Sequence, residues 1–298
     1  MLNEQQIFTV EIDGLNIADQ IFNCNDRLFI SHPKDADDNI SNVFVVIDRP
    51  LSIGQGGHAW ESEENKKHAK DTEEVLRIVG TFLACYNLVN KKNILEIAFG
   101  VPSVMTFHDT SRVLQLVKTG GGCHPYIKSQ KPKLSVNETM NSLNSTIPVF
   151  EKAISLIEKT NKKIDPLQVA LLSYQRSIRK KEVLQDFLGL VTCIESLLSS
   201  KEDLRYKFAL RTSLFLESEP EKRKEMFDEL YVIYGARNKL VHGEDTSAYP
   251  YADYYRFELY LEPIVQKLIL KYLDLASLGK NKKMIVQELD DIALGFNK

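Results

Sequence analysis

The chain has 298 residues, of which 43% are hydrophobic and 27% are charged. These values are typical of a folded globular protein, and they exclude a disordered chain, a collagen and a disulfide-rich miniprotein. At roughly 100–200 residues per domain, the length predicts two domains. The formal net charge of −3 excludes a basic field over the whole surface, so any nucleic-acid site must be local.

The cysteines and the apolar runs predict no metal and no membrane contact. None of the four cysteines pairs with another Cys or His at the spacing of zinc ligands; they are Cys24, Cys85, Cys123 and Cys193. We therefore expect reduced thiols and no cofactor. Apolar runs stay well short of the ~20 residues that a membrane helix needs, and we recognise no secretory leader. The expected location is cytoplasmic.

Residues 1–147 have the pattern of an α+β domain. Apolar and polar residues alternate over residues 7–12 and again over residues 43–47, which predicts strands. A helix is expected over residues 71–90. Glycines, prolines and a Ser/Asn-rich stretch over residues 118–147 predict a linker that ends at the domain boundary. This half resembles no family that we recognise, and we expect a sensing or regulatory role for it.

The remainder, residues 148–298, has the apolar period of helices and predicts an all-α bundle. Within it, Pro166 after Asp165 predicts a helix start, and Pro220 in a first turn predicts another. The long helices are expected over residues 182–198, 204–216, 220–242 and 251–275, with a short one near 283–294.

The most informative stretch is Arg-Asn-Lys-Leu-Val-His-Gly at residues 237–243. On a helix of 3.6 residues per turn, Asn238 and His242 lie on one face, whereas Arg237 lies about 140° away from His242. Gly243 favours the left-handed conformation that ends a helix, which places His242 in the last turn. A histidine can exchange protons near neutral pH, and a guanidinium can bind phosphate oxygens through two parallel hydrogen bonds.

These residues carry a family resemblance. Residues 148–298 resemble a HEPN domain, whose ribonuclease members carry Arg-Asn-x-x-x-His, as Arg237, Asn238 and His242 do here. The surrounding segments that start at Val191, Lys207 and Leu230 are most similar to the ApeA-like subgroup of bacterial anti-phage proteins.

The resemblance implies a homodimer in which two such motifs form one composite, metal-independent endoribonuclease site across a two-fold axis. The 2′-hydroxyl of the RNA would be the nucleophile. His242 would assist proton transfer, Arg237 would stabilise charge on the transition state, and Asn238 would orient the histidine or the phosphate. In defence or toxin proteins of this kind, the N-terminal part would restrain the nuclease until a phage-derived trigger binds.

Three further residues are candidates for the site. Glu195 lies among apolar residues on an earlier helix, and we expect it to pair with Arg237 or to hold a ring nitrogen of His242. An alternative is that Glu195 lies on the solvated edge of its helix. We expect Lys239 and Tyr234, which flank the motif, to contact the substrate.

Other interpretations stay open. The histidine could cap the carbonyls of its helix while the arginine pairs with a carboxylate to hold the bundle together. The domain would then be a catalytically silent HEPN module that dimerises or binds nucleic acid in a larger complex. Nucleotide transfer is disfavoured, because the first half lacks a Gly-Ser and paired-Asp pattern.

Overall fold

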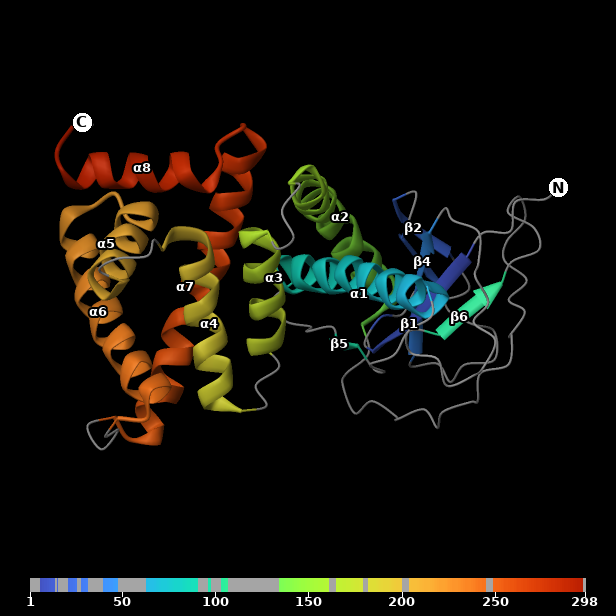
Figure 1. The fold of residues 1–298 in the computed structure, drawn as a ribbon, viewed down its shortest axis with the longest axis horizontal. Coiled ribbons are helices and arrows are strands. Elements are labelled where there is room, and N and C mark those ends of the chain that lie inside the picture. The colour runs from blue at the N-terminus through green and yellow to red at the C-terminus, as the bar shows by residue number, and fades with distance from the viewer. Residues whose placement is uncertain are drawn as a thin grey trace. The chain divides into compact units, whose positions relative to one another are not determined.

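A computed structural model divides the chain into two compact units, Met1–Glu151 and Lys152–Lys298 (Figure 1). We describe each unit by itself. The residues that the structure describes are 6–13, 15, 21–25, 28–31, 40–47, 63–90, 96–97, 103–106, 134–160, 165–178, 182–199, 204–244 and 249–296.

The first unit contains a small antiparallel sheet. Its strands are β1 (Gln6–Asp13), β2 (Ile21–Asn25), β3 (Leu28–Ser31), β4 (Ile40–Ile47), β5 (Glu96–Ile97) and β6 (Ser103–Thr106). The order is β2-β3-β4-β1-β5, and β6 also pairs with β1. β1 and β4 pair along their whole length, with Phe8 opposite Val45. The two alternating segments of the sequence are therefore neighbours in the sheet.

This unit also contains the helix α1 (Glu63–Val89) and most of α2 (Val136–Lys159), whose residues from Lys152 on belong to the second unit. Phe82 of α1 meets Phe150 of α2 edge to face, with ring centroids 5.5 Å apart. The side-chain amide of Asn90, just after α1, donates hydrogen bonds to the Ser142 carbonyl (3.4 Å) and the Thr146 hydroxyl (3.1 Å). The two helices are thus joined by both apolar and polar contacts.

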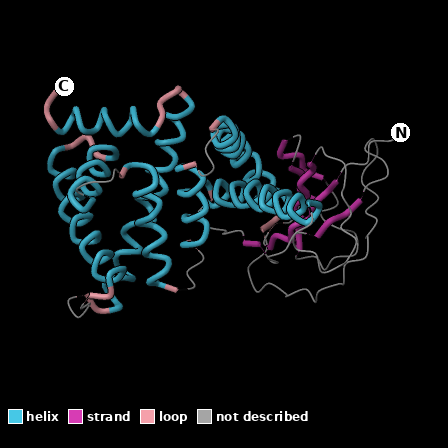
Figure 2. The backbone as a smooth tube through the Cα atoms, in the orientation of Figure 1, coloured by secondary structure: helices cyan, strands magenta, loops and turns pink. Residues whose placement is uncertain are grey.

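The fold class expected from the sequence, an α+β domain followed by an all-α bundle, is wrong for the described chain. Helices make up most of the described residues, as Figure 2 shows in cyan, and the small sheet is a minor part, so the described chain as a whole is mostly all-α. α1 and α2 supply most of the buried apolar side chains that are described in the first unit. The helix predicted over residues 71–90 corresponds to α1, which begins earlier, at Glu63. The polar first turns of α1 and α2 hid where the two helices begin.

The end of the expected linker is also helical. α2 begins at Val136, inside the stretch over 118–147 that composition assigned to a linker, and runs through Pro148. Its start is a capping box, in which the Glu138 carboxylate accepts hydrogen bonds from the backbone N–H of Ser135 (2.9 Å) and from its hydroxyl (2.7 Å). These bonds lower the pKa of Glu138. Residues 118–133 lie outside the described part of the chain.

The second unit is helical throughout its described residues. Its helices are α3 (Pro166–Ser177), α4 (Val183–Leu198), α5 (Leu204–Leu216), α6 (Pro220–His242), α7 (Tyr251–Ser277) and α8 (Lys282–Ala293). α3 starts as the sequence predicts, because the Asp165 carboxylate accepts a hydrogen bond from the backbone N–H of Leu167 at 2.8 Å. Asn281 caps α8 through the N–H of Met284 in the same way.

The core of this unit lies where α4 packs between α3 and α7, while α5 pairs with α6. Phe187 of α4 contacts the rings of Tyr254 and Phe257 on α7. Phe208 of α5 contacts Tyr234 of α6, with ring centroids 4.9 Å apart. α4 and α6 are thereby held in fixed positions by buried aromatic side chains.

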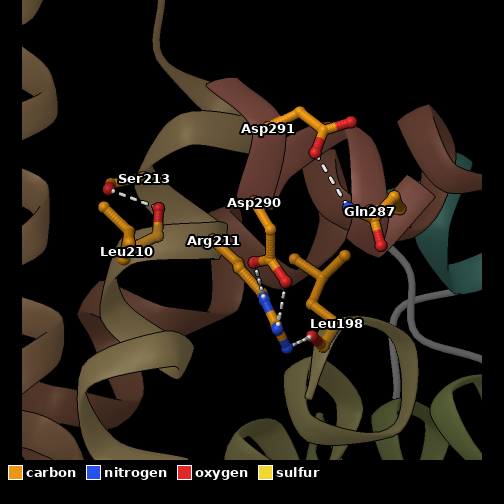
Figure 3. Close-up of polar contacts among 7 residues, drawn as sticks. All are labelled: Leu198, Leu210, Arg211, Ser213, Gln287, Asp290 and Asp291. Carbon is orange, nitrogen blue, oxygen red and sulfur yellow. Dashed lines mark hydrogen bonds and ion pairs between the residues drawn. The ribbon is translucent and has the colours of Figure 1, made fainter. Parts of the chain in front are cut away.

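A buried arginine fastens α8 to the other helices (Figure 3). The side chain of Arg211 on α5 is 2% exposed, and its guanidinium binds both carboxylate oxygens of Asp290 on α8 at 2.8 Å. The same guanidinium donates to the Leu198 carbonyl at the end of α4, at 3.0 Å. Lys282 of α8 donates to the neighbouring Ser196 carbonyl at 2.6 Å. Cations from α5 and α8 thus satisfy the carbonyls that the last turn of α4 leaves without helical partners.

The described cysteines are free thiols in the core. Cys24, Cys85 and Cys193 are buried, and burial raises the pKa of Cys24 to about 12. Their thiol form is therefore favoured at neutral pH. Cys123 lies outside the described residues.

Candidate functional site

The motif at residues 237–243 closes α6. Gly243 has φ 64° and ψ 26°, the left-handed conformation that the sequence predicts. Its backbone N–H donates to the Leu240 carbonyl at 3.4 Å, and the N–H of Glu244 donates to the Lys239 carbonyl at 2.9 Å. This pair of hydrogen bonds is a Schellman motif. His242 is consequently the last residue of α6, and it is exposed.

Replacing Gly243 by alanine is expected to cost about 1 kcal/mol in the free energy of unfolding. An added Cβ would meet no atom within 4 Å, so the cost is the conformational strain of a left-handed residue alone. Urea unfolding would measure it. Gly243→Asn is the matched control, because asparagine tolerates this conformation better than alanine. Equal stability of the alanine variant and the natural protein would contradict the left-handed conformation assigned to Gly243.

Glu195 joins α4 to the motif. One of its carboxylate oxygens accepts a hydrogen bond from the Tyr234 hydroxyl at 2.7 Å, and the other accepts from Nη2 of Arg237 at 3.3 Å. The side chains of Glu195 and Arg237 are 18% and 23% exposed. Of the two partners that the sequence predicted for Glu195, the structure therefore shows Arg237. The alternative, a glutamate on the solvated edge of its helix, does not fit a side chain that is only 18% exposed and bound at both oxygens.

Tyr234 lies behind this ion pair. The guanidinium carbon of Arg237 is 5.3 Å from the centroid of the Tyr234 ring, which is buried. Burial raises the pKa of Tyr234 well above its ordinary value, the Glu195 carboxylate raises it further, and Arg237 lowers it. The hydroxyl therefore stays protonated and keeps donating to Glu195 at physiological pH.

Asn238 and Lys239 extend the cluster along α6. Nη1 of Arg237 donates to Oδ1 of Asn238 at 3.3 Å. Arg237 is about 140° from His242 around the helix, but its long side chain thus returns toward the face that Asn238 and His242 share. The ammonium of Lys239 lies 5.6 Å from the centroid of the Tyr249 ring, a cation–π contact.

The arrangement brings together four of the six predicted site residues: Glu195, Tyr234, Arg237 and Asn238. His242 lies one helical turn beyond Asn238, and Lys239 points to Tyr249. Within one chain, therefore, a positioned guanidinium and an exposed imidazole occupy the same end of α6 without contacting each other in the described residues.

Two neighbours of this cluster were not predicted. Lys282 belongs to a lysine run that had the composition of a solvated face, yet its ammonium reaches the carbonyls of α4 next to Glu195. Arg205 stacks on Tyr231 across α5 and α6. Gly235 makes room for Arg205, and a glycine inside a helix is the one sequence signal that could have indicated this contact.

Replacing Glu195 by alanine is expected to destabilise the fold by about 1–3 kcal/mol. The change leaves the buried Tyr234 hydroxyl without its acceptor and removes the carboxylate that holds Arg237. Glu195→Gln should cost less, because an amide oxygen can still accept from Tyr234. The measurement is a double-mutant cycle with Tyr234→Phe in urea. Strictly additive effects of the two substitutions would contradict the contact.

The described residues contain no group of three or more His, Cys, Asp and Glu side chains that could hold a metal ion. Among the same residues, none of the helices is long and apolar enough to span a membrane. A comparison of the chain with protein-family models, curated proteins and solved structures finds no match.

Proposed function

We propose that this chain is a metal-independent endoribonuclease of the HEPN type that acts on RNA in the cytoplasm. The observation that supports this most is the fixed position of Arg237. Glu195 and Tyr234 hold it against Asn238, at the same end of α6 as the exposed His242. The sequence resemblance of residues 148–298 to ribonuclease members of that family supplies the type of reaction.

The proposed chemistry needs only these side chains and the RNA. The 2′-hydroxyl attacks the adjacent phosphorus, the bond from phosphorus to the 5′-oxygen breaks, and the products carry a 2′,3′-cyclic phosphate and a 5′-hydroxyl. The 2′-hydroxyl loses a proton and the leaving 5′-oxygen gains one; His242 serves one of these transfers, and the same histidine of a second copy serves the other. Arg237 stabilises the charge on the phosphate oxygens. Glu195 and Asn238 use two of its five N–H donors, which leaves donors for those oxygens.

A homodimer would complete this site. Within one chain His242 has no contact with Arg237 in the described residues, so a single copy offers one imidazole and one guanidinium at separate positions. A two-fold axis beside the end of α6 would bring the same groups of a second copy to the same phosphate. The N-terminal unit would restrain this site until a phage-derived trigger binds, a role that rests on the resemblance to defence proteins alone.

One observation favours a second candidate function. The ion pair between Arg237 and Glu195 links α6 to α4, which is also what a purely structural arginine would do. The chain would then be a catalytically silent module that dimerises or binds nucleic acid within a larger complex. The two candidates differ in RNA cleavage, not in dimer formation.

The test is incubation of the purified protein with total tRNA and a labelled single-stranded RNA in EDTA. His242→Ala protein, purified in the same way, controls for contaminating nuclease. We expect cleavage by the natural protein only, with cyclic-phosphate ends. Products with 3′-hydroxyl ends, or cleavage that needs an added divalent metal, would contradict the proposal. A dimer without cleavage, alone or with phage lysate, would favour the silent module.

A further inference from the structure

Three aromatic rings and one arginine form a cluster at the surface where α5 and α6 run side by side (Figure 1). Phe227 and Tyr231 stack on α6, with ring centroids 5.9 Å apart and an interplanar angle of 22°. Tyr206 of α5 meets Phe227 edge to face at 5.5 Å. The guanidinium carbon of Arg205 lies 3.8 Å from the centroid of the Tyr231 ring. We call these four residues the ring cluster.

The ring cluster is open to solvent although it is largely apolar. Tyr206 is 53% exposed and Tyr231 is 37% exposed. Exposed rings beside a guanidinium are the features with which proteins bind unpaired bases, since every base has a face that stacks on an aromatic ring or an arginine plane. Aliphatic side chains would cover the same surface without offering such a face.

Arg205 is held in place from two sides. Its Nε donates a hydrogen bond to the backbone carbonyl of Tyr231 at 2.8 Å. Gly235 leaves room for the rest of the guanidinium, because a Cβ at that position would lie 2.7 Å from Nη2 of Arg205. The guanidinium of Arg205, which extends from α5, is thus fixed against α6 with its charge beside the Tyr231 ring.

The ring cluster lies on the same side of α6 as Asn238 and His242. At 100° per residue, Phe227, Tyr231, Asn238 and His242 fall within an arc of about 60° around α6. Tyr231 and His242 are about 16 Å apart along the helix axis, a distance that a short oligonucleotide spans. From Leu230 to His242 the helix carries Arg237 and Lys239 and no carboxylate. These two cations lie about 60–80° to either side of the arc, and Arg237 is paired with Glu195, so they favour a phosphate group near His242 rather than along the whole distance.

We propose that the ring cluster is a stacking platform for unpaired bases of single-stranded RNA, a few nucleotides away from the phosphate at His242. This inference rests on the proposed function for its ligand, and it deepens it by naming single-stranded RNA as the substrate class. Tyr206 and Tyr231 bind the bases, and Arg205 positions Tyr231 and contributes a positive charge.

The test is equilibrium binding of a fluorescent, single-stranded 2′-O-methyl RNA, measured by anisotropy with the full chain. This probe lacks the 2′-hydroxyl nucleophile, so binding is measured without cleavage. Tyr206→Ala and Tyr231→Ala should each weaken binding by about 5- to 150-fold. Tyr251→Ala, which removes a tyrosine that is 61% exposed on α7, is the matched control and should bind as the natural protein does.

A third variant separates the platform from a general loss of structure. Gly235→Ala places a methyl group where the guanidinium of Arg205 lies, and alanine is the better helix former. We expect this variant to keep or gain thermal stability while its affinity for the probe falls several-fold. Full affinity in Gly235→Ala together with full affinity in both tyrosine variants would overturn the inference.

Four further results would support or contradict the stacking platform. A duplex of the same sequence that binds as tightly as the single strand would overturn it, because paired bases cannot stack on the rings. A Tyr231→Ala protein that loses its dimer in sedimentation would overturn it in favour of a protein interface. Ring-dependent binding by a protein that cleaves no RNA would support the platform and contradict the nuclease. RNA cleavage by a protein whose affinity for the probe is unchanged in both tyrosine variants would support the nuclease and contradict the platform.

Discussion

Replacing His242 by alanine is expected to lower the rate of RNA cleavage by about 10²–10⁴-fold, the usual contribution of a general acid or base. The side chain is exposed at the end of α6, so the free energy of unfolding should change by less than about 0.5 kcal/mol. The measurements are single-turnover cleavage of a labelled RNA and urea unfolding of the same preparations.

Val241→Ala is the matched control for His242. Val241 is 49% exposed and is the preceding residue of the same helical turn, but it has no group that can transfer a proton. Cleavage by Val241→Ala should match that of the natural protein. A His242→Ala protein that cleaves at the natural rate would remove the histidine from the mechanism. A large loss in both variants would point to the helix end as a whole rather than to the imidazole.

Arg237 should behave differently from His242, because it contributes to both structure and chemistry. Arg237→Ala is expected to lower cleavage and also to destabilise the fold, since Glu195 loses its cation while remaining largely buried. Arg237→Lys keeps the charge but not the planar fork of donors, so its cleavage rate should lie between those of the natural protein and of Arg237→Ala. Stability and rate together therefore separate the two roles of this side chain.

Replacing Asp290 by alanine is expected to destabilise the chain by about 3 kcal/mol. The change removes the carboxylate that pairs with the buried guanidinium of Arg211 (Figure 3). Breaking a buried ion pair from one side costs about 3–5 kcal/mol, and the lower end applies because the Asp290 side chain is 35% exposed. Urea unfolding would measure the loss.

Asp291→Ala provides the control for Asp290. The neighbouring Asp291 accepts a hydrogen bond from Gln287 at the exposed surface of α8, so its loss should change the stability by less than about 0.5 kcal/mol. The double replacement Arg211→Met with Asp290→Leu should recover most of the stability, because no buried charge is then left unpaired. Equal effects of Asp290→Ala and Asp291→Ala would show that the buried pair contributes nothing.

Helices of the second unit could be predicted where an apolar face recurs with the helical period, as in α4 and α8, or where a local signal marks a start or an end. Pro166 after Asp165 and Gly243 at the end of α6 are local signals, and the structure shows both. The start of α2 carried a signal of the same kind, Ser135 followed by Glu138. The polar composition around this capping box was given more weight than the box itself, and so the helix was missed.

The candidate site was predictable only in part, because sequence spacing does not fix which helices face each other. Helix arithmetic put Asn238 beside His242, and an ionisable group among apolar residues indicated that Glu195 needs a partner. The choice of Arg237 as that partner depends on how α4 packs against α6. The contacts of Arg205 and Lys282 depend on tertiary packing in the same way, and neither residue lies within a motif.

The contacts of Asp290 and Lys282 with the other helices limit how this chain can be shortened. The last described helix would be an obvious segment to trim for expression or crystallisation. Its removal would take away Asp290, which pairs with the buried guanidinium of Arg211, and Lys282, which donates to the Ser196 carbonyl next to Glu195. A protease that cuts between Ser277 and Lys282 would therefore disturb the surroundings of Glu195 from a distance, so the proposed cleavage should be tested with the intact chain.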